Sequence, residues 1–269
     1  MESAVDRIRA AGLGIAAISY DSVEVLKQFS ARTGITFPLL SDADSAVIRK
    51  FRILNETIDK GTPFYGIPNP GTYILDRRGV VTSKFFEEDF RVRDTAASIV
   101  LRQFGITAGR HEAARGKHID LAISASDREA RPGQRVTFSV DASPGKGIHV
   151  YAPGVQGYIP VALTLDPSKA FTPDTPSFPR AKIMNLPAIR ERVPVYDAPF
   201  RIQQTITLAA ANALEPLLDK DRNLIIPARF RYQACDDKEC FVPETVPVQW
   251  TIHILPFDRT RVTEPARRN

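Results

Sequence analysis

Cysteine is scarce in this sequence: the chain of 269 residues has two, Cys235 and Cys240, with four polar residues between them. A structural zinc site needs about four ligands, and no other cysteine or histidine stands at ligand spacing from this pair. The sequence therefore predicts no metal site, and it implies no organic cofactor.

Long apolar runs are also missing. No stretch approaches the length of a membrane-spanning helix, and the first residues, MESAVDRIRAAGLG, lack the apolar core of a signal peptide. Basic and aromatic residues form no array of the kind that binds nucleic acid. The net charge of +5 is modest, and part of the excess lies in residues 257–269, which we expect to be a solvated basic tail.

The composition is that of an ordinary soluble globular protein. Hydrophobic residues make up 43% of the chain and charged residues 25%, so a packed core is expected, and the length allows two domains. Two cysteines placed close together suit either a redox pair or an oxidising compartment. Composition alone does not choose between the two.

The first third of the chain alternates between strand and helix patterns. The continuous apolar run 14–20 predicts a buried strand, and Asp21 or Ser22 is placed to cap a helix that Gly34 ends. We expect an extended piece at 37–41, a helix at 45–51 capped by Asp42 or Asp44, antiparallel strands at 71–76 and 80–85, and a closing helix at 91–104. This order indicates a mostly parallel sheet with one antiparallel edge.

Three motifs of this region resemble the alkyl hydroperoxide reductase / thiol-specific antioxidant family. They are GLGIAAISYDS (12–22), FPLLSD (37–42) and GIPNPGTYILDRRGVV (66–81), in that order. The resemblance covers residues 1–106 and implies a peroxiredoxin-like domain of thioredoxin fold. It also implies a cis bond before Pro70, because the family's proline at that place is commonly cis.

The catalytic cysteine of that family has no counterpart in residues 1–106. In the family it stands at the start of the helix that precedes residue 12, after an earlier strand, whereas this chain begins inside that helix. We therefore expect an N-terminally incomplete domain, whose missing strand would lie between 14–20 and 71–76. As written, this domain cannot act as a thiol peroxidase.

The chain changes character after the polar stretch 107–117, which we interpret as a linker. Residues 118–256 are rich in proline and predict short strands at 118–126, 134–141, 147–151, 158–165, 199–208, 223–232 and 246–254. Short strands at this spacing indicate an immunoglobulin-like β-sandwich, with Trp250 in its core and residues 166–196 as a long irregular loop. The expected fold class is thus α/β followed by all-β: a partial thioredoxin-like domain, then an immunoglobulin-like sandwich.

The two cysteines stand between the last two predicted strands. Strands joined by a four-residue loop form a hairpin, and the residues that flank the loop face each other at a separation that a disulfide accepts. Such a pair is a redox-active pair, a structural disulfide or two inert thiols. A loop this short gives only about 2 kcal/mol by chain entropy, so the redox-active pair is the preferred interpretation.

The surroundings of the cysteines resemble the N-terminal periplasmic domain of the transmembrane thiol reductase DsbD. The motifs are KGIHVYAPG (146–154), VYDAPF (195–200), YQAC (232–235) and CFVPE (240–244). The resemblance implies a periplasmic or otherwise extracytoplasmic protein that passes electrons to a thioredoxin-fold thiol–disulfide partner. It assigns contact with the partner to Cys240 and resolution of the mixed disulfide to Cys235. The spacing of the pair is one residue shorter than in the best-known member.

Candidate residues for a pocket around the cysteines are Tyr151, Tyr158, Ile189, Tyr196, Tyr232 and Phe241. Tyr151 and Tyr158 either line the pocket or pack in the sandwich. Ile189 falls nearest the place of the aromatic cap that shields the family's cysteines, because residues 186–194 contain no aromatic side chain. His149 either tunes a thiol or, the preferred interpretation, lies exposed on its strand. The acidic neighbours of the cysteines disfavour a thiolate.

These patterns predict a thiol–disulfide oxidoreductase that works as a redox shuttle or reductase partner through Cys235 and Cys240. Two alternatives stay open. In one, the disulfide is structural and the chain is a non-enzymatic module that binds a partner. In the other, the chain is a fragment of a peroxiredoxin-type antioxidant enzyme whose active cysteine lies upstream of Met1.

Overall fold

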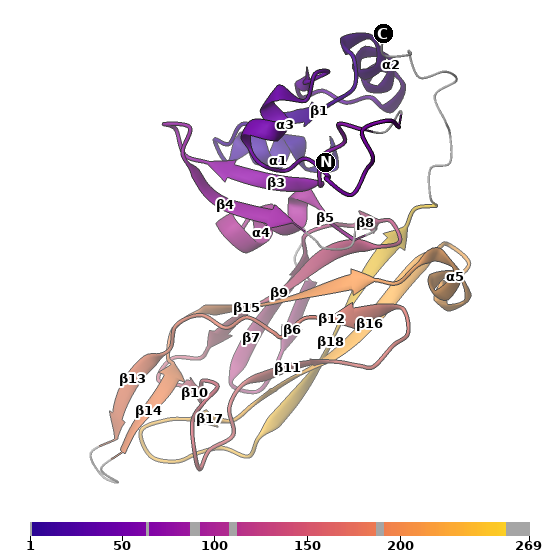
Figure 1. Ribbon diagram of the computed structural model, residues 1–269. Helices are drawn as coiled ribbons and strands as arrows, with labels where there is room; N and C mark the ends of the chain where they lie inside the picture. Colours follow the sequence, from indigo (N-terminus) through magenta and orange to yellow (C-terminus); the bar gives the residue numbers. More distant parts are fainter. Residues whose placement is uncertain (1, 63–64, 87–91, 108–111, 187–190, 257–269) are drawn as a thin grey trace. The chain divides into compact units, whose positions relative to one another are not determined.

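A computed structural model describes residues 2–62, 65–86, 92–107, 112–186 and 191–256 (Figure 1). Contacts along the backbone divide the chain into two compact units, residues 1–94 with 258–269 and residues 95–257. The first unit mixes helices and strands, and the second is built almost entirely of strands. The expected fold class is therefore confirmed. The expected basic tail at 257–269 lies outside the described residues.

The first unit consists of short elements. In chain order they are η1 (Glu2–Ala4), α1 (Val5–Ala10), β1 (Ala17–Ser19), α2 (Val23–Thr33), β2 (Leu39–Ser41), α3 (Ala46–Lys50), β3 (Gly71–Leu75), β4 (Val81–Phe86) and β5 (Arg93–Asp94). The Oγ of Ser22 accepts a hydrogen bond from the amide of Val25 (3.3 Å), and Gly34 ends α2 at a φ of 67°. The carboxylates of Asp42 and Asp44 both accept amide hydrogen bonds from the first turn of α3. The predicted caps are confirmed.

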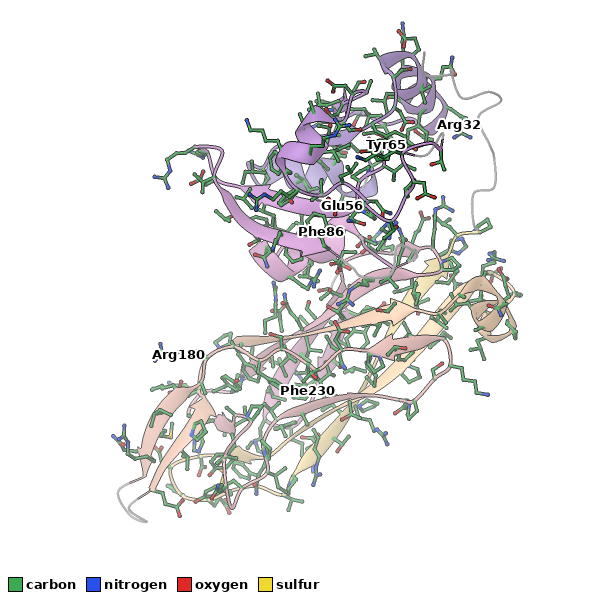
Figure 2. The ribbon with its side chains drawn as sticks, viewed as in Figure 1. Arg32, Glu56, Tyr65, Phe86, Arg180 and Phe230 are labelled. Atoms are coloured by element: carbon green, nitrogen blue, oxygen red, sulfur yellow. A yellow bond between two sulfur atoms is a disulfide. The ribbon has the colours of Figure 1, made fainter. Side chains whose placement is uncertain are left out.

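The strands of the first unit form two small sheets. β1 pairs in parallel with β2, and β3 pairs antiparallel with β4. Among the described residues these remain two separate two-stranded sheets. The ring of Phe86 on β4, labelled in Figure 2, packs against the ring of Tyr73 on β3, with ring centroids 5.2 Å apart. Apolar side chains of these strands stay exposed, with Ile18 at 42%, Leu40 at 50% and Leu75 at 49%.

The expected cis proline is wrong. The bond between Asn69 and Pro70 is trans, because the described residues contain no cis peptide bond. The trans form of an X–Pro bond is favoured by about 0.5–1 kcal/mol, and only surrounding contacts can reverse that preference. A sequence motif does not show whether such contacts are present.

The second unit begins with a helix and continues with strands. Its elements are α4 (Ala96–Phe104), β6 (Glu112–Arg115), β7 (Ile119–Ala125), β8 (Glu129–Ala130), β9 (Gln134–Pro144), β10 (His149–Tyr151), β11 (Ala162–Leu165), β12 (Phe171–Pro173), β13 (Lys182–Leu186), β14 (Glu191–Tyr196), β15 (Phe200–Leu208), α5 (Ala211–Leu214), η2 (Glu215–Leu217), β16 (Asn223–Tyr232), β17 (Ala234–Cys235) and β18 (Glu244–Ile254). Every strand predicted between 118 and 254 is present. The expected linker contains β6, and the expected irregular stretch 166–196 contains β12, β13 and β14, whose short or mixed patterns give no clear period.

Two larger sheets enclose the core of this unit. One has the strand order β12-β15-β9-β7-β6, and the other has the order β11-β16-β18-β8. On β16 and β18 the side chains alternate between buried and exposed, as expected for strands with one face on a core. Phe138 on β9 stacks on Trp250 on β18, with ring centroids 4.7 Å apart, and Phe230 is fully buried (Figure 2). The prediction that Trp250 lies in the core is confirmed.

Helix α4 belongs to the second unit by its contacts. The hydroxyl of Ser98 lies 2.7 Å from that of Thr137 on β9, and Gln203 on β15 donates to the carbonyl of Leu101 (3.1 Å). The carbonyl of Gly105, just beyond the helix, accepts from Arg201 (2.6 Å). The sequence pattern predicts this helix as part of the first domain, since an apolar helical pattern shows that a face is covered but not which element covers it.

A third, smaller sheet has the order β13-β14-β10-β17. Figure 1 shows it at one end of the sandwich, with α5 at the opposite end. This sheet holds the first cysteine of the pair. Among the described residues, no helix has the length and apolar character needed to span a membrane.

Candidate redox site

Cys235 and Cys240 form a disulfide, with their Cα atoms 4.0 Å apart. The two residues are antiparallel bridge partners. The amide of Asp236 donates to the carbonyl of Glu239 (3.0 Å). The amide of Phe241, which follows Cys240, donates to the carbonyl of Ala234, which precedes Cys235 (2.8 Å). The predicted four-residue loop is therefore a closed turn at the tip of a hairpin.

The Asp236 carboxylate holds this turn in place. Its Oδ1 accepts hydrogen bonds from the amides of Lys238 (2.8 Å) and Glu239 (2.9 Å). These bonds lower the pKa of the Asp236 carboxyl, so it is charged at neutral pH. Asp237 and Glu239 are exposed beside it. The rim of the loop is thus acidic, and negative charges near a sulfur disfavour its thiolate.

The two sulfur-bearing residues differ sharply in exposure. Cys235 is 1% exposed, whereas Cys240 is exposed, as is the neighbouring Val242 at 87%. A protein partner can therefore reach Cys240 and not Cys235.

The small sheet explains why Cys235 is buried. β17 leaves the ladder of β16 and β18 and pairs with β10, where Cys235 stands opposite His149. On its other side β10 pairs with β14, where Tyr151 stands opposite Val195. Because side chains alternate along a strand, His149 and Tyr151 share the face of the sheet that carries Cys235.

Tyr151 contacts both sulfurs of the disulfide. Its hydroxyl lies 3.5 Å from the Sγ of Cys235 and 3.5 Å from the Sγ of Cys240. Since the oxidised sulfurs carry no hydrogen, the hydroxyl is the donor. Burial, together with Tyr158 and Glu191, raises the pKa of Tyr151 to about 12, so the hydroxyl keeps its hydrogen at any physiological pH.

Tyr158 extends this arrangement towards the surface. Its ring stacks on Tyr151 with centroids 4.2 Å apart, and its hydroxyl donates to Glu191 (2.8 Å). This hydrogen bond raises the pKa of Tyr158. Of the candidate pocket residues, the structure thus brings Tyr151 and Tyr158 together beside the disulfide. The contact with Glu191 carries no sequence signal, because it joins residues far apart in the chain.

Two other candidate tyrosines do not line the disulfide. Tyr196 stands opposite Val150, on the other face of the small sheet, where its ring stacks on Phe200 (4.2 Å) and its hydroxyl donates to the carbonyl of Pro179 (2.8 Å). Tyr232 is buried in the main core of the sandwich. Tyr232 stands three positions before Cys235, and Tyr196 belongs to a separate motif of the same resemblance, but neither side chain lies beside the disulfide.

Tyr232 instead fixes the base of the cysteine hairpin. Its hydroxyl donates to the carboxylate of Glu244, which also accepts the amide of Lys117 (2.9 Å). Burial raises the pKa of Glu244, but these two hydrogen bonds together with the charge of Lys117 lower it overall. Phe241, which follows the exposed cysteine, stacks on the ring of His118 with centroids 4.0 Å apart. The hairpin is therefore held against the start of β7.

His149 differs from its preferred interpretation. It is 5% exposed rather than solvent-exposed, and its ring edge meets Tyr151 at a centroid distance of 5.6 Å. Strand β10 is covered on both faces, which the three-residue motif does not reveal. Ile189 lies outside the described residues. Within the described ranges, no group of three or more His, Cys, Asp or Glu side chains is arranged to hold a metal ion.

Comparison with family models covers both units. Residues 1–84 match the AhpC/TSA family. Residues 122–250 match the N-terminal domain family of the thiol:disulfide interchange protein DsbD. Both resemblances that the motifs carry are thereby confirmed. Two redox families and a formed disulfide support thiol–disulfide chemistry in general.

Individual relatives match parts of the chain. Peroxiredoxin Bcp of Xanthomonas campestris pv. campestris is 38% identical over 71 residues, which are 26% of this chain and 44% of that protein. The chain therefore spans less than half the length of this relative. The N-terminal periplasmic domain of ScsB from Proteus mirabilis is 10% identical, with a TM-score of 0.36 over 52% of this chain and 49% of that one. The N-terminal domain of Neisseria meningitidis DsbD in the reduced form is 16% identical, with a TM-score of 0.27 over 43% and 77%.

Proposed function

We propose that this protein exchanges electrons with a protein partner through the Cys235–Cys240 disulfide. The observation that carries the proposal is the asymmetry of the pair: one sulfur-bearing residue is exposed and the other is buried beside it. Exchange through a mixed disulfide needs an accessible sulfur and a second sulfur close enough to resolve it. Cys240 takes the first role and Cys235 the second, as the resemblance to DsbD implies.

The exchange proceeds in two displacements when the reduced pair meets an oxidised partner. The thiolate of Cys240 attacks one sulfur of the partner's disulfide, whose other sulfur leaves as a thiolate and takes a proton. Cys235 then loses its proton and attacks the Sγ of Cys240, and the bond between Cys240 and the partner breaks. Two electrons have passed to the partner, and the Cys235–Cys240 disulfide is restored.

The proposed partner is a thioredoxin-fold thiol–disulfide protein. The family match over 122–250 supports this partner class, because the resemblance to DsbD implies it. It also supports a periplasmic or otherwise extracytoplasmic location. A formed disulfide agrees with such a location, since disulfides persist in oxidising compartments.

Trapping assays on single cysteine variants test the roles of the two sulfurs. With Cys235→Ser, the mixed disulfide on Cys240 should accumulate because nothing resolves it. With Cys240→Ser, no mixed disulfide with a thioredoxin-fold protein should form. Non-reducing gels and mass spectrometry detect the adduct. Trapping by neither variant would favour the structural disulfide and a binding role.

A redox titration against glutathione decides independently whether the pair is a redox shuttle or a structural disulfide. A shuttle pair should equilibrate with glutathione, whereas a structural disulfide stays oxidised at potentials below about −300 mV. Hydroperoxide turnover in the same preparation should not exceed that of the double variant Cys235→Ser/Cys240→Ser, because residues 1–106 contain no cysteine. Turnover above that background would favour the antioxidant alternative.

A further inference from the structure

His149 carries a buried nitrogen that has no hydrogen-bond partner among the described residues of the oxidised protein. The side chain is 5% exposed, and its Nε2 makes no hydrogen bond. A buried polar atom left unpaired costs folding free energy. A hydrogen-bond donor that forms in the other redox state of the pair would remove this cost.

The two neighbours of β10 provide a sulfur on one side of His149 and a carboxylate on the other. On one side, Cys235 stands directly opposite it. Side chains directly opposite on one face of an antiparallel pair lie about 4.5–5.5 Å apart at Cβ. On its other side β10 pairs with β14, and Asp197 directly follows that strand. His149 therefore lies between the sulfur of one neighbouring strand and the carboxylate at the end of the other.

We propose that His149 accepts the proton of Cys235 when the pair is reduced, and so serves as the base for the resolving displacement. This inference rests on the proposed exchange function. Reduction gives the Cys235 sulfur a hydrogen, which supplies the donor that Nε2 lacks in the oxidised form. The imidazole takes this proton as Cys235 attacks the Sγ of Cys240, and it passes the proton to the departing thiolate or to water.

The charges around His149 suit this role. The charged and titratable groups that face it are Asp197 with its partner Lys182, Asp236, Asp237 and Tyr151. Burial lowers the pKa of His149, against the opposing pull of the three carboxylates. The imidazole is therefore neutral at pH 7 and able to accept a proton. Asp197, whose own pKa is lowered by the hydrogen bond from Lys182, stays charged and stabilises the imidazolium that forms.

A small aromatic disulfide that releases a coloured thiolate separates the two displacements in the reduced full-length protein. Attack by Cys240 on the reagent releases the first thiolate, at a rate that increases with reagent concentration. Attack by Cys235 on the resulting mixed disulfide releases the second thiolate. The rate of this second release is independent of reagent concentration because the step is intramolecular. Stopped-flow measurements from pH 5 to 9 on wild type, His149→Gln and His149→Phe record both steps. The phenylalanine keeps the ring edge against Tyr151 but has no nitrogen.

In wild type the rate of the second release should rise with pH, reach a plateau once the imidazole is neutral, and stay level to about pH 8. In both variants it should be about a hundredfold slower at pH 7 and rise about tenfold per pH unit towards the thiol pKa. The first rate should be unchanged, which separates loss of a base from a general disturbance. His253→Gln, which removes a half-buried imidazole from β18, should match wild type in both steps.

Two results would overturn the inference. One is a wild-type second step that rises tenfold per pH unit without a plateau, whatever the variants do. The other is a plateau that survives in the folded variants. A wild-type protein that shows no concentration-independent release at all would instead contradict the exchange function itself, because Cys235 would then not resolve any adduct on Cys240.

Discussion

Tyr151 shows how one side chain can serve both redox states of the pair. Its hydroxyl reaches both sulfurs at 3.5 Å, and its ring is almost fully buried. In the oxidised state the hydrogen bond to a neutral sulfur is weak. In the reduced state the same hydroxyl can donate to a thiolate, and hydrogen bonds to charged groups are stronger. Tyr151 therefore opposes the acidic rim, which disfavours that thiolate.

We expect Tyr151→Phe to raise the pKa of the Cys240 thiol in the reduced protein. A hydrogen bond to a charged group contributes about 1.5–3 kcal/mol, which corresponds to a pKa change of about one to two. Alkylation by iodoacetamide, followed over pH, measures this pKa. At pH 7 the variant should react about tenfold more slowly, because a smaller fraction of Cys240 is thiolate.

The matched control for this prediction is Tyr196→Phe. It removes a hydroxyl from a buried tyrosine of the same small sheet, but on the opposite face, where the hydroxyl donates to a carbonyl. Its alkylation profile should coincide with that of wild type. A Tyr151→Phe profile that also coincides with wild type would show that the hydroxyl has no role in the reduced state.

At the scale of elements, a chain of buried hydroxyls joins α4 to the sandwich. Ser98 on α4 meets Thr137 on β9 at 2.7 Å, and Thr137 meets Thr205 on β15 at 2.8 Å. Strand β9 is consequently buried on both faces, with apolar side chains in the core and hydroxyls under the helix. This arrangement explains why its sequence lacks a simple alternation of apolar and polar residues.

Thr137→Val should destabilise the protein by about 1–3 kcal/mol, because it leaves the hydroxyls of Ser98 and Thr205 buried without this partner. The triple variant Ser98→Ala/Thr137→Val/Thr205→Val should recover most of that loss, since apolar groups of similar shape replace all three. Urea unfolding measures both changes. The exposed Thr251→Val on β18 is the control and should stay within about 0.5 kcal/mol of wild type. A triple variant with the summed cost of three single variants would contradict this account.

At the scale of the whole molecule, the chain divides just before α4, the helix that its sequence pattern assigns to the first domain. The compact units separate between Asp94 and Thr95, whereas the sequence places the boundary at 106/107. The difference matters because Ser98 and Leu101 of α4 form hydrogen bonds with β9 and β15 of the sandwich. We propose that the redox unit begins at residue 95.

Two fragments test this boundary. A fragment of residues 95–257 should fold cooperatively and keep the glutathione redox equilibrium of the full chain. A fragment of residues 107–257 should lose about 1–3 kcal/mol of unfolding free energy, because it lacks Ser98 and leaves the buried hydroxyl of Thr137 without this partner. Urea unfolding monitored by Trp250 fluorescence compares them. Equal midpoints and slopes would show that α4 is dispensable for the sandwich and that 106/107 is the boundary.

The sequence by itself determined the features that depend on neighbouring residues. Ser22 and Gly34 mark the ends of α2 because capping needs only the residues of one turn. The alternation of apolar and polar residues in β16 and β18 predicts both strands. The four residues between the cysteines predict the closed loop, which brings the two cysteines close enough to form a disulfide. The family motifs likewise identify both halves of the chain.

Only the tertiary structure decided how the pair is presented. Cys235 and Cys240 look equivalent in the sequence, but the pairing of β17 with β10 buries the first and leaves the second exposed. Tyr151, which meets both sulfurs, lies 84 positions from Cys235. Contacts across such distances depend on which strands become neighbours, and a local pattern of polar and apolar residues does not encode that choice. The same reason accounts for α4, whose apolar surface is evident in the sequence but whose partner is not.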